Sequence, residues 1–190
     1  ANSMPFKTGL TFTYDSGEFE KNMDLALEMA DFFGFENRKA ESIKRSLLRG
    51  IGVSNTIERA AAPGIETSEI RVDRSGSLTI LAGSCTQGQG HETVFKQIVC
   101  DKLGLEMENV NYIWGDTDKV AFGHGAGGSR SATLGGAAVL MATDKIIEKA
   151  KKIAAHQLEA AVEDIEFFEG TFSVAGTDKK LDFSAVAKAS

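Results

Sequence analysis

The apolar residues near the start of the chain recur every three or four positions, the spacing of one helix face. Over residues 18–33 this spacing predicts an amphipathic helix, with Asp15 and Ser16 as candidate N-caps. A second helix, rich in Arg and Lys, is expected over about residues 37–48, with Gly50 ending it. The first third of the chain is therefore predicted to be largely helical.

After Gly50 the apolar spacing changes to a period of two, which is typical of strands. The alternation begins with Ile51, Val53 and Ile57, and it returns in two segments centred on residues 70–72 and 78–80, with a Ser75-Gly76 turn between them. A helix over residues 94–103 closed by Gly104 and a strand over residues 110–114 follow. Strands and helices thus alternate in this region.

The last third predicts one long helix and a hairpin. The helix is expected over about residues 133–160, and its first part, residues 135–138, is made of Gly and Ala. Residues 166–168 and 171–174 predict a hairpin around Glu169-Gly170, and a further helix is expected to start at Phe183. Together the elements predict an α+β fold, a layered mixed sheet with helices, in a single domain over residues 1–190.

Two glycine-rich stretches carry the strongest chemical signal, and each is expected to open a helix. The first runs over residues 87–93 and the second over residues 123–131. A glycine-rich turn lets backbone N–H groups converge, and the unpaired donors of the first helical turn favour a bound anion. Two such loops in one domain predict a large phosphate-bearing or otherwise polar ligand.

Each loop also has a purely structural interpretation. Gln87-Gly88-Gln89-Gly90 fits close backbone approach to a ligand, with Gln89 donating and accepting hydrogen bonds, but it equally fits an empty strand-to-helix connection. His91 is either a ligand contact or an ordinary exposed residue of a first helical turn, and Glu92 is favoured at that position by the helix dipole alone. Arg130, between Ser129 and Ser131, presents a planar fork suited to phosphate or makes a surface salt bridge.

Composition excludes several classes of protein. A net charge of −6 does not suit a general nucleic-acid binder. The two cysteines, Cys85 and Cys100, have no CxxC spacing, which predicts free thiols in a reducing cytoplasm and no metal site. No apolar run approaches the ~20 residues of a membrane span. We therefore expect a soluble cytoplasmic protein with no catalytic triad and no metal-ligating cluster.

The order of the motifs resembles the large subunit of molybdenum hydroxylases. Ser84-Cys85-Thr86-Gln87-Gly88-Gln89-Gly90-His91-Glu92-Thr93 is similar to the segment that surrounds the molybdopterin cofactor, and Trp114-Gly115-Asp116-Thr117-Asp118 is similar to the family's GDTD turn. Gly128-Ser129-Arg130-Ser131 resembles a second cofactor loop. Tyr14-Asp15-Ser16-Gly17 and Ile153-Ala154-Ala155-His156 extend the match. The pattern looks like carbon monoxide dehydrogenase large chains, within the xanthine dehydrogenase and aldehyde oxidase family.

The resemblance implies a cofactor and the residues that contact it. The cofactor would be molybdopterin or its cytosine dinucleotide, and it would carry molybdenum in the parent enzyme. That parent would be an oxidoreductase that catalyses oxidative hydroxylation or the oxidation of carbon monoxide, aldehydes or N-heterocycles. The residues it assigns to cofactor binding are Gln87, Gly88, Gln89, Gly90, His91, Thr93, Gly128, Ser129, Arg130 and Ser131. It assigns no catalytic residue and no protein ligand to the metal.

The sequence also departs from the family pattern. Ala126 and Gly127 stand where family members have Thr-Tyr, and the motif carrying the family's catalytic glutamate is absent. We therefore expect a piece, or a separately encoded part, of a large subunit that is inactive alone and lacks cofactor. Its partners would be the rest of that subunit and iron–sulfur and flavin subunits or domains. A non-catalytic phosphate- or nucleotide-binding module and a structural subunit remain the alternatives.

A piece of a larger subunit is expected to leave some apolar surface uncovered. The candidates are the small-residue stretch 135–138 and the aromatic hairpin with Phe167, Phe168 and Phe172. Large exposed apolar patches drive association. The sequence thus predicts self-association, or an apolar or glycine-lined groove beside the two loops.

Overall fold

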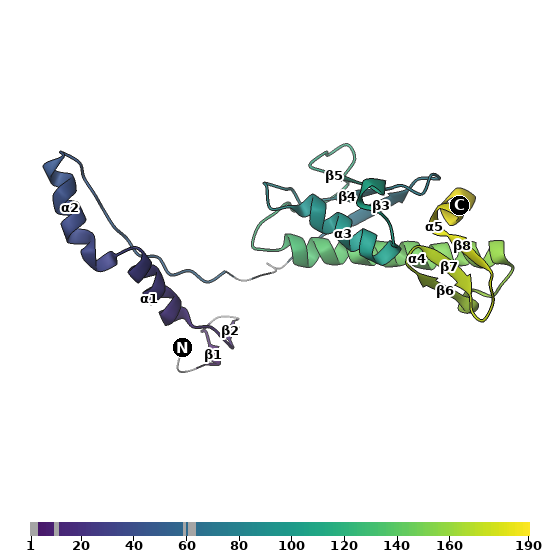
Figure 1. Cartoon of the computed structure of the whole chain (residues 1–190), viewed down its shortest axis with the longest axis horizontal. Helices are drawn as coiled ribbons and strands as arrows, with labels where there is room; N and C mark the ends of the chain where they lie inside the picture. The colour runs from purple at the N-terminus through teal and green to yellow at the C-terminus, as the bar shows by residue number, and fades with distance from the viewer. Residues whose placement is uncertain (1–3, 10–11, 59, 61–63) are drawn as a thin grey trace. The chain divides into compact units, whose positions relative to one another are not determined.

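The computed structural model describes residues 4–9, 12–58, 60 and 64–190 (Figure 1). Its internal contacts divide the chain into two compact units, residues 1–57 and residues 58–190. Each unit is described by itself. Both glycine-rich loops belong to the second unit.

The first unit is built from short elements. Strands β1 (Phe6–Lys7) and β2 (Thr13–Tyr14) pair antiparallel, and α1 (Phe19–Met29), a 3-10 turn (Phe32–Gly34) and α2 (Phe35–Lys44) follow. Among its described residues only Ser42 is buried, while large apolar side chains such as Met29 and Phe33 are exposed. The described part of this unit therefore has no hydrophobic core of its own.

Both predicted helices of this unit are shorter than expected. The first ends at Met29 because Asp31 adopts a left-handed conformation, and its N-cap is Glu18, without the side-chain cap expected from Asp15 or Ser16. The second ends at Lys44 because Ser46 is left-handed, so Leu47 N–H donates back to the Ser42 carbonyl.

The strand predicted from Ile51, Val53 and Ile57 was wrong. The described residues of this segment, 51–58, form no regular secondary structure and are all exposed. An alternating pattern forms a strand only where a neighbouring strand accepts its hydrogen bonds. The structure provides no such neighbour among the described residues.

The second unit contains a three-stranded mixed sheet in the order β3-β4-β5. Strands β3 (Ser68–Val72) and β4 (Leu78–Ala82) form the predicted hairpin, in which Asp73 N–H donates to the Ser77 carbonyl and Gly76 has a positive φ. Helix α3 (His91–Leu103) connects β4 to the parallel strand β5 (Val110–Trp114). The first glycine-rich loop is the connection from β4 to α3.

The long helix α4 (Gly136–Leu158) extends from the first sheet to a second one (Figure 1). One turn of π-helix (Ser131–Gly135) precedes it, so the second loop also leads into a helix as predicted. Strands β6 (Ile165–Phe168) and β7 (Thr171–Val174) form the expected hairpin, and β8 (Lys180–Asp182), which was not predicted, pairs with β7 before α5 (Phe183–Ala189).

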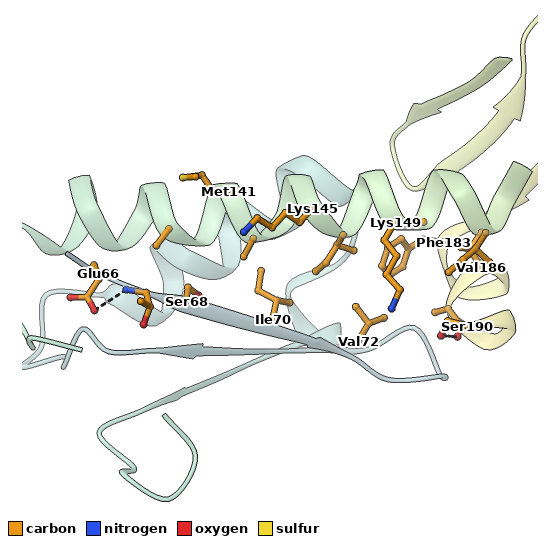
Figure 2. Close-up of a pocket in the computed structure, with 17 residues that line it drawn as sticks. Glu66, Ser68, Ile70, Val72, Met141, Lys145, Lys149, Phe183, Val186 and Ser190 are labelled. Carbon is orange, nitrogen blue, oxygen red and sulfur yellow. Dashed lines mark hydrogen bonds between the residues drawn. The ribbon is translucent and has the colours of Figure 1, made fainter. Parts of the chain in front are cut away.

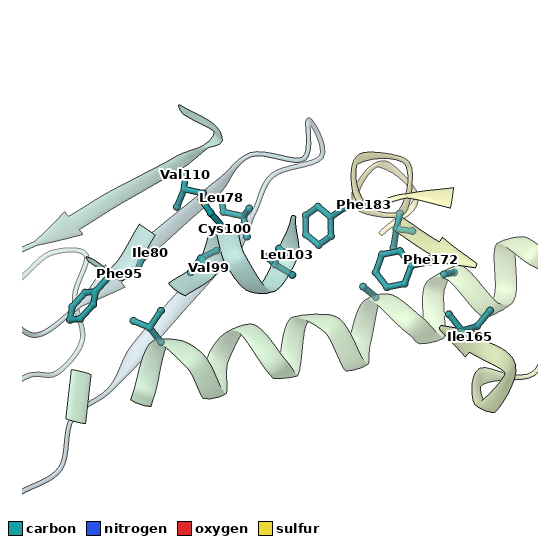
Figure 3. Close-up of a cluster of buried hydrophobic side chains, with 14 of the residues drawn as sticks. Leu78, Ile80, Phe95, Val99, Cys100, Leu103, Val110, Ile165, Phe172 and Phe183 are labelled. Carbon is teal, nitrogen blue, oxygen red and sulfur yellow. The ribbon is translucent and has the colours of Figure 1, made fainter. Parts of the chain in front are cut away.

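The hydrophobic core lies between α4, α3 and the two sheets (Figure 3). Phe95, Val99 and Leu103 recur on one face of α3 and are fully buried. They meet β4 and β5, and Phe172 and Phe183 continue the core toward the second sheet. The structure confirms the predicted fold class, an α+β arrangement of mixed sheet and helices.

Candidate functional site

The first glycine-rich loop leaves β4 and is held by its own side chains. Gly88 and Gly90 have positive φ, which L-residues rarely adopt, and Gly90 is the left-handed N-cap of α3. The Gln89 side chain accepts a hydrogen bond from Gln87 N–H at 2.5 Å and donates from Nε2 to Gln87 Oε1 at 3.0 Å. Gln89 thus shapes the loop from within.

Helix α3 begins at this loop with open backbone donors. No side chain caps its N-terminus. His91 is 6% exposed and its ring stacks on Phe95 at a centroid distance of 5.7 Å. His91 Nδ1 is buried without a hydrogen-bond partner, and so is the nearby Ser84 Oγ. Buried polar atoms are nearly always hydrogen-bonded, so these two atoms are available to bind a further polar group.

The second loop ends in a strained turn. Ser129 is left-handed, with φ of 52°, and its Oγ donates to Glu58 Oε1 at 2.9 Å. Arg130 is only 8% exposed, and its Nη2 donates to the Ile65 carbonyl at 2.7 Å. The alternative for Arg130 was a surface salt bridge. Arg130 does form a salt bridge, with Glu66, but both side chains are buried, so the expected surface location was wrong.

The two loops meet at one pocket of about 450 Å³. Six of the ten predicted site residues line it, three from each loop, while Gly88, Gly90, Thr93 and Gly128 do not. Predicted site residues from both loops therefore lie around the same hollow. The full lining is Gln87, Gln89, His91, Val94, Phe95, Ala126, Gly127, Ser129, Arg130, Ser131 and Ala132.

Sequence reasoning missed two polar residues of this region. Ser84 belongs to the motif that resembles the cofactor segment, but the resemblance assigns it no role. Glu66, with a side chain only 2% exposed, lies 3.5 Å from Arg130 Nη2 through its Oε2. No sequence signal marks Glu66, because Glu66 and Arg130 lie far apart in the chain and only the fold brings them together.

A larger groove of about 590 Å³ lies between β3, α4 and α5 (Figure 2). Its walls are mainly apolar, with Ile70 and Val72 from β3 and Phe183 and Val186 from α5, and Lys145 and Lys149 lie along it. Glu66 lines the groove too, and it does not line the pocket between the loops. We assign no chemistry to the groove, because the orphaned polar atoms of the glycine loops lie at the smaller pocket.

The predicted exposed surfaces are partly covered. Phe168 is 73% exposed, whereas Phe172 is fully buried and Phe167 is half-buried. In the small-residue stretch Gly135 and Gly136 are buried and Ala137 is exposed. The aromatic hairpin therefore contributes to the core through one face only.

Tyr112 lies on β5 beneath the first loop. Its hydroxyl donates to the Ser84 carbonyl at 3.1 Å, and its ring packs edge-on against Phe95. Burial raises the pKa of Tyr112 to about 12, with smaller contributions from the Cys85 thiol and two carboxyl groups. The phenol therefore remains a neutral donor that fixes the backbone at the start of the loop.

The predicted turn after β5 is stabilised by local contacts. Gly115 has a positive φ, and Asp116 accepts from Asp118 N–H at 3.1 Å and from Lys119 at 3.0 Å. The Lys119 hydrogen bond keeps the pKa of Asp116 below its ordinary value. Both cysteines are free, as predicted. Across residues 4–9, 12–58, 60 and 64–190, no cluster of side chains suits a metal ion, and no helix is long and apolar enough for a bilayer.

Comparison with known proteins identifies the family. The family model described as "Molybdopterin cofactor-binding domain" matches residues 25–190. The chain is 35% identical over 193 residues to the carbon monoxide dehydrogenase large chain of Hydrogenophaga pseudoflava, covering 93% of this chain and 24% of that protein. It is 33% identical to subunit gamma of the 6-hydroxypseudooxynicotine dehydrogenase complex of Paenarthrobacter nicotinovorans, covering 100% of this chain and 24% of that subunit.

Solved structures agree with the sequence matches. Carbon monoxide dehydrogenase from Oligotropha carboxidovorans matches with a TM-score of 0.70 and 33% identity, over 98% of this chain and 25% of that chain. The chain therefore belongs to the molybdopterin cofactor-binding domain family. It spans about a quarter of the length of the relatives that it matches.

Proposed function

We propose that the two glycine-rich loops form one side of a molybdopterin-binding site in a molybdenum hydroxylase large subunit. The observation that carries the proposal is the shared pocket, lined by Gln87, Gln89 and His91 from one loop and by Ser129, Arg130 and Ser131 from the other. Its volume of about 450 Å³ lies within the range of small-molecule and cofactor sites.

The residues at this pocket fit a polar, phosphate-bearing cofactor. His91 Nδ1 and Arg130 Nε are buried without hydrogen-bond partners among the described residues. An added Cβ at Gly88, Gly90, Gly125 or Gly127 would meet nothing within 4 Å, so the loop backbones border open space. Exposed backbone N–H groups and unpartnered side-chain nitrogens can bind the oxygens of a phosphate and the polar atoms of a pterin ring.

The chain's residues would bind and orient the cofactor. When bound, molybdopterin carries the molybdenum that supplies the oxidative hydroxylation chemistry. We assign Gln87, Gly88, Gln89, Gly90, His91 and Thr93 to the pterin and dithiolene side. We assign Gly128, Ser129, Arg130 and Ser131 to the phosphate, or to the pyrophosphate of a cytosine dinucleotide form.

The activity and partners of the whole protein follow as proposals from its relatives. Carbon monoxide dehydrogenase and quinoline 2-oxidoreductase are among the structures that it resembles, and the nicotine-related relatives are named as subunits. We propose an oxidoreductase that works with the rest of its large subunit and with iron–sulfur and flavin partners. The free apolar groove beside β3 also supports self-association of the isolated chain.

We further propose that both compact units belong to one molybdopterin-binding domain. The family model begins at residue 25, inside the first unit, and continues through the second. The structural match likewise extends over 98% of the chain.

Equilibrium dialysis with molybdopterin, read by pterin fluorescence, tests the proposed site. We expect wild type to bind the added cofactor weakly, because the pocket holds it from one side only. Ser131→Ala, which removes a buried hydroxyl from the pocket, should bind about tenfold more weakly still. Thr177→Ala, in the turn between β7 and β8, is the matched control and should bind like wild type. Absence of binding by wild type, or equal binding by all three proteins, would contradict the proposal.

A further inference from the structure

The segment 64–67, which leads into β3, contacts the chain at both ends of the second glycine-rich loop. At the start of the loop, Thr67 Oγ1 donates to the Phe122 carbonyl at 3.0 Å. At its end, Arg130 Nη2 donates to the Ile65 carbonyl at 2.7 Å. We call residues 64–67 the clamp segment. Because these two contacts bracket the loop, the clamp segment restricts the loop's shape without lining the pocket.

Glu66 adds a charge to the clamp segment at the Arg130 end. Its side chain is 2% exposed and that of Arg130 is 9% exposed, and Glu66 Oε2 lies 3.5 Å from Arg130 Nη2. Glu66 Oε1 accepts from Thr67 N–H at 3.3 Å, which fixes the carboxylate on its own backbone. A buried charge is strongly disfavoured without its counter-charge, so each residue keeps the other in place.

Gly64 leaves no spare room beside this ion pair. Its φ is +155°, and an added Cβ would lie 3.2 Å from Arg130 Nη2. The guanidinium therefore packs against the clamp backbone on one side and the Glu66 carboxylate on another. Arg130 has little freedom to turn toward a ligand.

We propose that Glu66 is a positioning residue that acts through Arg130 to hold the second glycine-rich loop in its binding shape. That Glu66 orders the loop rests on the contacts of the clamp segment alone. That this order matters for cofactor binding rests on the proposed function. In this arrangement Glu66 balances the Arg130 charge at Nη2, so Arg130 adds only its unpartnered Nε to the phosphate site assigned above. The phosphate is held chiefly by backbone N–H groups and by the hydroxyls of Ser129 and Ser131. Arg130 serves the site by ordering that backbone.

Hydrogen exchange without any ligand tests the structural part. Leu134 N–H donates to the Arg130 carbonyl at 2.8 Å and reports on the turn that follows Arg130, while Gly104 N–H, bonded to Cys100, reports on α3. We expect Glu66→Gln to speed exchange at Leu134 about tenfold and to leave Gly104 unchanged.

Glu69→Gln is the matched control, because Glu69 lies on β3, directly after the clamp segment, and pairs with Arg71 at the surface. It should leave Leu134 exchange at the wild-type rate. Glu66→Asp, which keeps the charge on a shorter side chain, should exchange at an intermediate rate. Wild-type exchange at Leu134 in Glu66→Gln would overturn the inference, whether or not the chain binds a cofactor.

A double-mutant cycle with pyrophosphate as the ligand tests whether Arg130 orders the loop or binds the anion directly. We expect Glu66→Gln and Arg130→Met each to weaken binding by about tenfold and the double variant to bind no more weakly than either. If Arg130 instead grips the anion directly, Glu66→Gln will tighten binding, because it removes a competing negative charge. That result would overturn the inference. No binding by wild type would contradict the proposed function and leave the exchange result to decide the positioning role.

Discussion

The backbones of Gly83 and Gly123 cross so closely that a Cβ on either residue would overlap the Cα of the other. Gly83 follows β4 and leads into the first glycine-rich loop, whereas Gly123 opens the second. The crossing therefore joins the two loops at their beginnings. Both positions require glycine for a steric reason, because only glycine lacks the Cβ atom that would clash.

Replacement of Gly123 by alanine is expected to destabilise the second unit. The new methyl group would press on backbone atoms of Gly83, which cannot move aside as a flexible side chain can, at a cost of about 1–3 kcal/mol. Thermal unfolding of Gly123→Ala measures the loss. Gly127→Ala is the control within the same loop, because a Cβ there meets nothing within 4 Å. Equal melting temperatures for the two variants would show that the crossing is not tight.

Phe172 and Phe168 of the β6–β7 hairpin should differ sharply in their contribution to stability. Phe172 is fully buried and contacts Phe167 at a ring distance of 4.5 Å, whereas Phe168 is 73% exposed. We expect Phe172→Ala to lower the free energy of unfolding by about 3–5 kcal/mol, and Phe168→Ala to change it by less than about 0.5 kcal/mol. Denaturant unfolding of both variants checks this, and a large loss for Phe168→Ala would mean that a partner covers it.

Tyr112 should make the fold sensitive to alkaline pH. Its pKa is about 12 in the folded chain against an ordinary value of 10.0, so folding favours the neutral phenol. This contribution is fully present below pH 10 and is lost as the pH rises from 10 to about 12. We expect the unfolding free energy to fall more steeply over that interval in wild type than in Tyr112→Phe. Parallel pH profiles would contradict the assigned pKa.

The isolated chain is expected to carry no stoichiometric molybdenum and to show no hydroxylase activity. It spans about a quarter of its relatives, and a large ligand held from one side loses most of its burial. Elemental analysis of the purified chain measures the metal content. A value near one molybdenum per chain would show that this chain holds the cofactor alone.

The sequence predicted those elements whose signals are local. The β3–β4 hairpin, the helix ending at Gly104 and the strand over residues 110–114 all formed, because each combines a clear apolar period with a turn glycine. Strand β8 was not predicted, because a strand of three residues is too short to show a recognisable alternation of apolar and polar positions. The strand predicted over residues 51–57 did not form, because no described strand lies beside these residues to pair with them.

The candidate site was predictable only in part, for a similar reason. The two loops were found from their own glycine patterns, and both line one pocket. Glu66 was not found, because its importance comes from a contact with Arg130 that only the folded chain creates. The burial of Arg130 was missed too, since an arginine between two serines suggests exposure.

The central claim, that the two loops act as one binding site, is tested most directly by backbone NMR during a pyrophosphate titration. The amide signals of His91 at the start of α3 and of Ser131 in the second loop should shift together, with one common midpoint. Amides of the β6–β7 hairpin should not move. Shifts confined to one loop, or two separate midpoints, would contradict the account.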